Sequence, residues 1–218
     1  MTEAEIRRAI VEACRAMNAL GINQGTSGNI SVRHDGTMLI TPTSTPYDEM
    51  CPEDIAAVAI PGEDETWKGR RPPSTEWRFH RDILRARPEA GAIVHAHPPY
   101  CTALAIARRD IPGCHYMMAV FGGTDVRVAD YATFGTSELS RNALAALEGR
   151  SACLLANHGM IVFGPSLRRA MWAAVELETI ARQYYLSLLI GGPHILSDTE
   201  IADAGRKLGA YGAQEKVA

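Results

Sequence analysis

Three histidines follow segments that are typical of buried strands, where imidazole rings can hold a metal ion. His95 and His97 stand two apart at the end of an apolar run, and residues i and i+2 of a strand point to the same face. His158 follows a second apolar run, and Gly159 after it lets the backbone turn sharply and present the ring. Three imidazoles with an exchangeable fourth position suit a catalytic zinc or similar divalent ion. Spacing alone leaves open that these histidines only pack in a core.

Glu76 is a fourth residue that could join such a site. Ser74 precedes it as the expected N-cap of a helix, which places Glu76 in the first turn, where the helix dipole favours a carboxylate. From the sequence alone, a capping-turn glutamate is the simpler interpretation. Three further histidines, His34, His80 and His194, are interpreted as solvated or packing residues.

Three small polar turns could bind an anion without lysine or arginine. Residues 25–29 form a glycine-flexible turn before a strand, and residues 41–45 form a hydroxyl-rich turn. Ser74 and Thr75 lie at a helix N-terminus, where free N–H groups point outward. Together these hydroxyls and amides suit a phosphate, although each turn alone is also an ordinary loop or cap. The sequence has no phosphate-binding loop ending in Gly-Lys and no strand-linked GxGxxG motif, which argues against a nucleotide.

The elements that must position these groups mix strands and helices. A helical stripe of Ile6, Ile10, Cys14 and Met17 is closed by Gly21. Several neighbouring strands are linked as hairpins instead of alternating with helices. We therefore expect one α/β domain over residues 1–218, with a mostly antiparallel mixed sheet flanked by helices. Strands are predicted at residues 29–33, 38–41, 55–60, 92–97, 126–129, 152–157 and 160–163, and further helices at residues 74–87, from 99, 136–149, 166–190 and 197–208.

The bulk composition fits a globular protein and excludes several other classes. With 218 residues, 46% of them hydrophobic and 22% charged, the chain can bury a substantial core. A net charge of -3 gives no basic footprint for nucleic acid. Five scattered cysteines without CxxC spacing favour reduced thiols. The acidic start lacks the features of a signal peptide, and the apolar runs are too short to span a bilayer, so we expect a cytoplasmic protein with no membrane partner.

Seven segments of the chain together resemble the class II aldolase and adducin-head family. They occur in the family's order and, with Leu196–Asp198, cover nearly the whole sequence. The resemblance implies a three-layer fold around a central mixed sheet, and it is strongest to members that cleave ketose 1-phosphates. The segments are Gly25–Arg33, Leu39–Thr43, Ser74–His80, His95–His97, Ile111–Met117, Tyr131–Thr136 and Asn157–Gly159.

The resemblance also implies two sets of binding residues. One metal ion per subunit, usually zinc, with cobalt or manganese as alternatives, would be held by Glu76, His95, His97 and His158. The substrate phosphate would be bound by Gly28, Asn29, Thr43, Ser44, Ser74 and Thr75. Ser44 and Thr75 depart from the family pattern, because a glycine and a serine are expected there. Both residues keep a backbone amide that can bind phosphate.

The same resemblance implies an assembly of several copies. Family members are usually fourfold tetramers with active sites between subunits. Tyr116 would then reach the site from a neighbouring subunit. Phe134 and Tyr211 would line the aldehyde end of the pocket.

The implied reaction is the reversible cleavage of a ketose 1-phosphate to dihydroxyacetone phosphate and an aldehyde. The ion would act as a Lewis acid on the enediolate left when the C3–C4 bond breaks. Tyr116 would take the C4 hydroxyl proton, and Glu76 would protonate C3 and act as the base in reverse. The sequence does not name the ketose: the candidates are L-fuculose 1-phosphate, 5-deoxyribulose 1-phosphate and 5-methylthioribulose 1-phosphate.

Other proteins on this fold are alternatives. Phosphopentulose 4-epimerases resemble the chain less, since an aspartate is usual where Glu76 stands. A methylthioribulose-phosphate dehydratase and a decarboxylase of phosphorylated sugar acids are conceivable on the same scaffold. A non-catalytic adducin-like interaction domain has no reason to keep a full set of metal ligands, and all four ligand positions are filled here.

Overall fold

An eight-stranded sheet runs through the centre of the computed structural model, which describes residues 1–62 and 65–214, with side chains up to residue 209. The strands lie in the order β4-β3-β2-β1-β5-β8-β7-β6, and paired neighbours are antiparallel except for β6 and β7. The predicted mostly antiparallel mixed sheet is therefore confirmed. The strand bounds are β1 Asn29–His34, β2 Thr37–Ile40, β3 Ala56–Ala59, β4 Trp67–Lys68, β5 Ala92–Ala96, β6 Val128–Ala129, β7 Ala152–Leu155 and β8 Gly159–Gly164.

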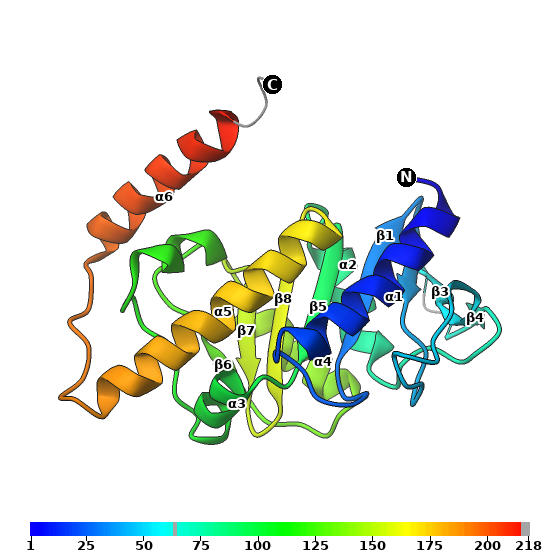
Figure 1. Ribbon diagram of the computed structural model, residues 1–218, viewed down its shortest axis with the longest axis horizontal. Coiled ribbons are helices and arrows are strands. Elements are labelled where there is room, and N and C mark those ends of the chain that lie inside the picture. The colour runs from blue at the N-terminus through cyan, green and yellow to red at the C-terminus, as the bar shows by residue number, and fades with distance from the viewer. Residues whose placement is uncertain (63–64, 215–218) are drawn as a thin grey trace.

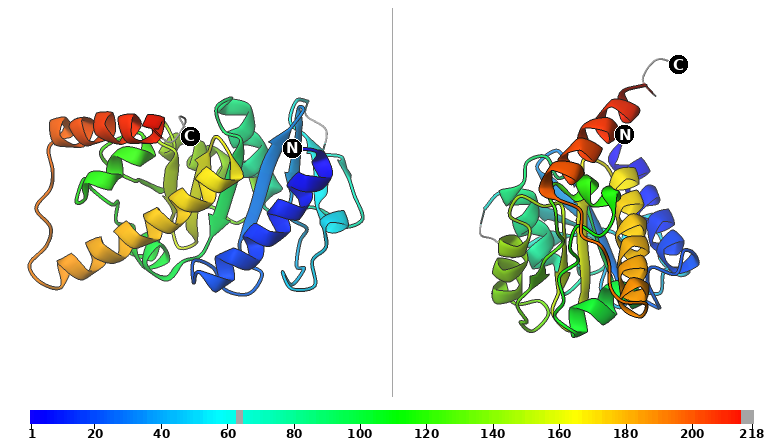
Figure 2. Two further views of the ribbon diagram at one scale, coloured as in Figure 1. Left: turned by 45° about the horizontal axis from the view of Figure 1, so that its top comes forward. Right: turned by 90° about the vertical axis from the view of Figure 1, so that its left-hand side faces the viewer.

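Helices cover both faces of this sheet and give the molecule three layers (Figures 1 and 2). One face packs against α1 (Glu3–Ala19), α3 (Pro99–Ile106) and α5 (Leu167–Leu188). The other face packs against α2 (Trp77–Ala86) and α4 (Ser137–Ala146). Alternate strand residues point to opposite faces, so the sheet separates two buried apolar cores, one on each side.

Two further helical segments lie at the side of the sheet that carries β6. The 3-10 helix η2 (Tyr116–Phe121) packs against the first part of α6 (Asp198–Gln214), where Ile201 is buried. From there α6 projects away from the body of the molecule, as Figure 1 shows in red. The helix extends past the predicted range of 197–208. A short 3-10 helix, η1 (Pro52–Asp54), precedes β3.

Most elements form where the hydrophobic pattern predicts them. The helix α1 begins with a capping box in which Thr2 and Glu5 satisfy each other's backbone N–H groups, and Gly21 follows it with φ +71°. The predicted hairpin joins β1 to β2 through Asp35 and Gly36, whose φ angles of +43° and +77° suit a tight two-residue turn. The segments β4, η1 and η2 and the parallel pairing of β6 with β7 were not predicted.

The start of α2 differs from the prediction in a way that matters for the site. Ser74 is not its N-cap, because the helix begins at Trp77 and Glu76 occupies the cap position. The preceding chain is held extended: Ser74 donates its N–H to the carbonyl oxygen of Thr41 at 2.9 Å, and Thr43 donates to that of Pro72 at 3.1 Å. The helix can start only after this pairing ends. Glu76 therefore lies at the junction between an extended segment and a helix, and not inside the first turn.

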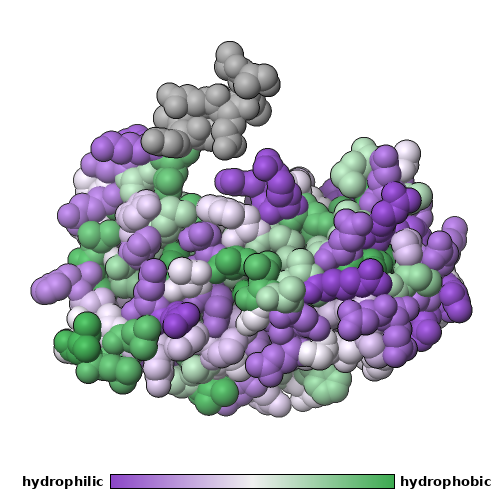
Figure 3. Space-filling model, in the orientation of Figure 1, coloured by the Kyte–Doolittle hydropathy of each residue, from purple (hydrophilic) through white to green (hydrophobic). Residues whose placement is uncertain are grey.

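The cysteines, the helices and the exposed apolar side chains add three observations about the chain as a whole. All five cysteines are free thiols. Within residues 1–62 and 65–214, no helix is both long and apolar enough to cross a membrane. Apolar side chains gather on the surface at the end of α5 and just beyond it, where Leu186, Leu189, Ile190 and Ile195 are exposed (green in Figure 3). Contiguous exposed apolar side chains of this kind mark surfaces that contact another protein.

Candidate active site

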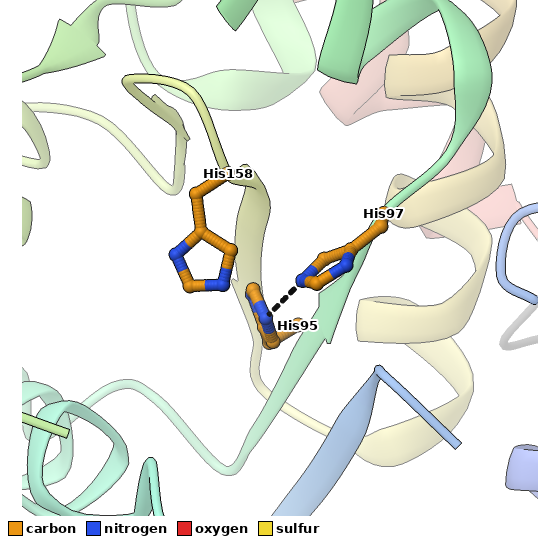
Figure 4. Close-up of side chains that lie close together, drawn as sticks. All are labelled: His95, His97 and His158. Carbon is orange, nitrogen blue, oxygen red and sulfur yellow. Dashed lines mark hydrogen bonds between the residues drawn. The ribbon is translucent and has the colours of Figure 1, made fainter. Parts of the chain in front are cut away.

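Three imidazoles converge where β5 ends beside the turn between β7 and β8 (Figure 4). Antiparallel pairing of β5 with β8 sets Ala96 opposite Met160, which brings His158 next to His95 and His97. One nitrogen from each ring lies within 4.8 Å of the others. The Nε2 atoms of His95 and His97 are 3.0 Å apart. The pair His95 and His97 and the single His158, from separate parts of the chain, are therefore aimed at one point.

The backbone around His158 is built for this approach. Asn157 makes the turn with φ +56°, in the left-handed region. Gly159 was predicted to supply the turn, but it has a different role. A Cβ atom at Gly159 would lie 2.5 Å from the carbonyl oxygen of Ala96 and 2.7 Å from the ring of His97. The glycine thus makes room for close packing of β8 against the end of β5, as any side chain would push the histidines apart.

Glu76 closes the cluster from the helical side. Its Oε2 atom lies 3.2 Å from His95 Nε2, and its Oε1 atom lies 3.2 Å from His158 Nε2. The residue is 6% exposed. Burial raises the pKa of the Glu76 carboxyl, but the charges that His95 and His158 carry when protonated lower it, and the net pKa lies well below the usual value. Glu76 is therefore an ionised carboxylate near neutral pH.

The protonation of the rings fits the binding of a cation. His95 Nδ1 donates to the carbonyl oxygen of Met160 at 2.9 Å, which directs Nε2 toward the cluster. Burial, together with the charges of His95 and His158, lowers the pKa of His97 to about 3. A neutral imidazole is the form that coordinates metal.

Nitrogen and oxygen atoms of these groups lie close together. His95 Nε2 is 3.2 Å from Glu76 Oε2 and 3.0 Å from His97 Nε2. Glu76 Oε1 is buried and accepts no hydrogen bond from the described residues. A buried carboxylate oxygen without a donor is costly, and a divalent cation would satisfy it together with the three imidazoles. The donor set of one carboxylate and three imidazole nitrogens therefore fits such an ion.

A cavity of about 380 Å³ opens directly onto this cluster. Glu76, His97 and His158 form one part of its wall. The other part contains all six residues expected to bind phosphate: Gly28, Asn29, Thr43, Ser44, Ser74 and Thr75. The side chains that line the cavity include no lysine or arginine. An anion in the cavity would have to be held by hydroxyl groups, backbone amides and a bound cation.

Two of these residues have conformations that the sequence does not reveal. Ser44 has φ +49°, in the left-handed region where glycine is usual, which explains why a glycine is expected at this position. The Asn29 side chain turns toward the carboxylate and donates from Nδ2 to Glu76 Oε2 at 2.9 Å. Its contribution to an anion site would then come from the backbone. Gly28 must be a glycine, since a Cβ atom there would lie 2.8 Å from the carbonyl oxygen of His95.

The three aromatic residues expected near the aldehyde are placed differently from one another. Phe134 is 62% exposed and lines the cavity. Tyr116 does not line the cavity of its own chain. It begins η2, and the last residue of η2 accepts a hydrogen bond from Ser151, just before β7. His158 follows the other end of β7. The expectation for Tyr211 falls outside the residues whose side chains the structure describes.

Sequence reasoning missed two residues near the site. Tyr131 lines the cavity beside Phe134 with half of its surface exposed. His80, interpreted as a solvated or packing residue, is fully buried and contacts Asn29 and Ser31. Burial, with a contribution from the charge of His95, lowers the pKa of His80 to about 3. The spacing of four residues from Glu76 places His80 on the same face of the helix, and this signal could have identified it.

Two characterised aldolases are similar to this chain over nearly its whole length. An aldolase of Rhodospirillum rubrum that acts on 5-methylthioribulose 1-phosphate and 5-deoxyribulose 1-phosphate is 49% identical over 207 residues, covering 95% of this chain and 92% of the relative. An L-fuculose phosphate aldolase of Escherichia coli is 45% identical over 213 residues, covering 97% of this chain and 98% of the relative.

A solved structure and a family model also match this chain over most of its length. A solved structure of an L-fuculose 1-phosphate aldolase matches with a TM-score of 0.91 at 37% sequence identity, covering 96% of this chain and 98% of the other. The model of the class II aldolase and adducin N-terminal domain matches residues 8–185, which include every strand and all four predicted metal ligands. This chain belongs to the class II aldolase and adducin N-terminal domain family.

Proposed function

We propose that this protein is a metal-dependent lyase that reversibly cleaves a ketose 1-phosphate to dihydroxyacetone phosphate and an aldehyde. The observation that carries the proposal is that one cavity joins a buried carboxylate and three imidazoles to a lining of hydroxyls and amides. Relatives that are 45% and 49% identical over nearly the whole chain are aldolases of this type.

Glu76, His95, His97 and His158 would hold the divalent ion, and we propose zinc because imidazole and carboxylate ligands suit it. When bound, the ion supplies a positive charge that stabilises negative charge on the substrate oxygens as the C3–C4 bond breaks or forms. The carbonyl contact of His95 Nδ1 fixes that ring, so its Nε2 stays aimed at the ligand position.

Glu76 would move the proton at C3. The carboxyl is ionised in this structure, which is the form needed to remove a proton from C3 of dihydroxyacetone phosphate in the direction of aldol addition. The protonated carboxyl then returns that proton to C3 when the reaction runs as cleavage. Tyr116 would give a proton to the aldehyde oxygen in addition and take it from the C4 hydroxyl in cleavage. Each direction thus begins and ends with the same number of protons on the two residues.

The polar wall of the cavity would bind the phosphate group. Thr43 and Ser44 carry hydroxyls 3.4 Å apart, and Ser74 and Thr75 lie on the turn that leads into α2. A phosphate held there would share the cavity with Glu76, which also forms part of its wall. This wall supports dihydroxyacetone phosphate as the common product, whichever aldehyde is released.

The aldehyde end would be apolar. Phe134, Tyr131 and Ala132 line this part of the cavity, and Tyr211 is proposed to join them. Such a wall suits an aldehyde that ends in a methyl or methylthio group. L-fuculose 1-phosphate, 5-deoxyribulose 1-phosphate and 5-methylthioribulose 1-phosphate all release an aldehyde of that kind.

The site would be completed between subunits of a homotetramer. Tyr116 is 51% exposed and lies away from the cavity of its own chain, so it can act only on a neighbouring copy. The exposed apolar side chains at the end of α5 also support association between copies. Cyclic assemblies of three or more subunits are built from heterologous interfaces, in which one surface of a subunit contacts a different surface of the next.

The proposal is tested by incubating the purified protein with each of the three ketose 1-phosphates. Dihydroxyacetone phosphate is measured by a coupled reduction, and the remaining sugar is examined by NMR. We expect dihydroxyacetone phosphate and the matching aldehyde from at least one substrate. A protein that produced only a C4 epimer or a dehydrated sugar would belong to a different reaction class. The Glu76→Gln variant, purified in parallel, controls for contaminating aldolases.

A further inference from the structure

A chain of hydrogen bonds leads from the cavity wall at Glu76 and Asn29 to Ser31 and His80, which do not line the cavity. It runs from Ser31 through His80 and Asn29 to the Glu76 carboxylate. Ser31 and His80 are fully buried, and Asn29 is 4% exposed. Asn29 and Ser31 stand two apart on β1 and therefore point to the same face of the sheet. His80 lies on α2, one turn after the N-cap residue Glu76. Phe79 stacks on the His80 ring with centroids 4.7 Å apart.

The direction of every hydrogen bond in this chain follows from the carboxylate. An ionised carboxylate only accepts, so Asn29 must present its Nδ2 donor to Glu76 Oε2, at 2.9 Å. Asn29 Oδ1 then faces His80 and only accepts, so His80 Nε2 must carry a proton. The neutral ring accepts at Nδ1, so the Ser31 hydroxyl donates to it, at 2.8 Å. Each group has a single orientation that satisfies its neighbours.

The chain makes the two oxygens of Glu76 different from each other. Oε2 receives the Asn29 hydrogen bond, whereas Oε1 lies 3.2 Å from His158 Nε2. The carboxylate is therefore held from the β1 side through Oε2.

We propose that His80 is a positioning residue which, acting through Asn29, fixes the orientation of the Glu76 carboxylate. This inference rests on the proposed function, because it concerns the orientation of the proposed base. Without the His80 donor, the Asn29 amide can rotate and turn its oxygen toward the carboxylate. Glu76 would then lose its anchor and occupy several orientations.

The first test reads the tautomer of His80 in the protein without substrate. Long-range proton–nitrogen spectra of protein labelled with ¹⁵N-histidine, assigned with His80→Gln, distinguish a proton on Nε2 from one on Nδ1. We expect His80 to be neutral with its proton on Nε2 near pH 7. A proton on Nδ1 would reverse the chain and overturn the proposal. An inactive protein with the expected tautomer would support the chain while contradicting the proposed aldolase reaction.

The second test compares two substitutions of His80. A glutamine can place an N–H near the position of Nε2, whereas a leucine of similar volume cannot. We expect exchange of the dihydroxyacetone phosphate C–H with deuterated water to fall about tenfold in His80→Leu, the scale of one hydrogen bond to a charged group. His80→Gln should recover most of this loss. The KM should change less than about twofold in both variants, since His80 does not line the cavity.

A double-substitution cycle shows whether His80 acts through Asn29. His80→Leu should slow exchange in the wild-type background and have almost no further effect in Asn29→Ala, because the intermediate link is already absent. Equal losses in both backgrounds would mean that His80 supports only the general packing of α2 and would overturn the proposal. Equal exchange rates for His80→Leu and His80→Gln would also overturn it.

Discussion

The two ends of β7 carry the two halves of the proposed chemistry, and they are built in opposite ways. At the end that leads to His158, Glu76 and His95 are buried among groups that fix their orientation. At the other end, Phe121 of η2 accepts a hydrogen bond from Ser151, and Tyr116 at the start of η2 is half exposed. The four residues of β7 span about 13 Å at ~3.3 Å each.

This difference indicates what one chain can do alone. The proposed metal ligands and the proposed base lie together in one chain, so we expect metal binding and proton removal from C3 to need no second copy. Tyr116 does not line the cavity of its own chain, so under the proposed function the step that involves the aldehyde oxygen depends on a neighbour. The two half-reactions, proton removal from C3 and proton transfer at the aldehyde oxygen, can therefore be tested separately.

Removal of the metal should have the largest effect, because both proposed half-reactions depend on the ion. Incubation with a strong chelator should abolish both cleavage and C–H exchange, since the substrate oxygens have no other buried counter-charge. Added zinc, cobalt or manganese should restore both. The chelated protein should also unfold at a lower temperature, because a ligand that binds only the folded state stabilises it. Full activity in a preparation shown to be metal-free would contradict the proposed site.

The Glu76→Gln variant should have the next largest effect and should also act within one chain. The amide fills the same space but cannot carry the proton, so exchange of the dihydroxyacetone phosphate C–H with deuterated water should fall by at least ~100-fold. Tyr116→Phe is the matched control, as it removes a hydroxyl from the other half-reaction. It should slow cleavage while exchange continues near the wild-type rate. Undiminished exchange in Glu76→Gln would assign the base to another residue.

The sequence predicts the histidine cluster and its strands well, and it predicts the rest of the site less well. Periodicity locates β5, β7 and β8, and the alternation of strand side chains places His95 and His97 on one face, as the structure has them. These are local properties that a short segment determines by itself. The resemblance to the family adds Glu76, whose place in the cluster no local pattern reveals.

What the sequence does not predict depends on contacts between distant segments. The start of α2 is delayed because Ser74 and Thr43 are tied to residues far away in sequence. The partners of His80 lie about fifty positions earlier in the chain, on β1. The pairing of β6 with β7 is likewise long-range, and two strand residues give too weak a pattern to predict it.

Mixing two inactive variants should recover part of the cleavage activity, which tests the shared half directly. Homo-oligomers of Tyr116→Phe and of Glu76→Gln each contain only impaired sites. In a scrambled cyclic assembly, about a quarter of the interfaces would pair an intact Tyr116 with an intact Glu76. Cleavage should therefore rise toward a quarter of the wild-type rate after subunit exchange. Exchange of the two labelled variants is confirmed by native mass spectrometry before the rates are compared.

The outcome of this mixing experiment distinguishes two arrangements of the site. A site formed within one subunit could not recover, because every subunit carries one of the two substitutions. Unchanged activity after proven exchange would place both residues in one chain's site or remove Tyr116 from the mechanism. Mixing either variant with itself provides the baseline.

The smallest effect should come from Ser44, which tests whether the self-contained half also stores backbone strain. Ser44 has φ +49°, a conformation that costs an L-residue roughly 1–2 kcal/mol, whereas glycine adopts it freely. Glycine also loses about 0.4–1 kcal/mol through the greater entropy of the unfolded chain. Ser44→Gly should therefore raise the free energy of unfolding by less than about 1 kcal/mol, measured by urea denaturation, and leave the KM nearly unchanged because the backbone amide remains.

Ser27→Gly is the matched control for this prediction. Ser27 lines the same cavity, but its φ is not positive and its hydroxyl donates to the carbonyl oxygen of Gln24 at 2.9 Å. The same substitution there removes a hydrogen bond and relieves no strain, so it should lower the free energy of unfolding by about 1 kcal/mol. If Ser44→Gly were as destabilising as Ser27→Gly, contacts of the Ser44 hydroxyl would outweigh the strain.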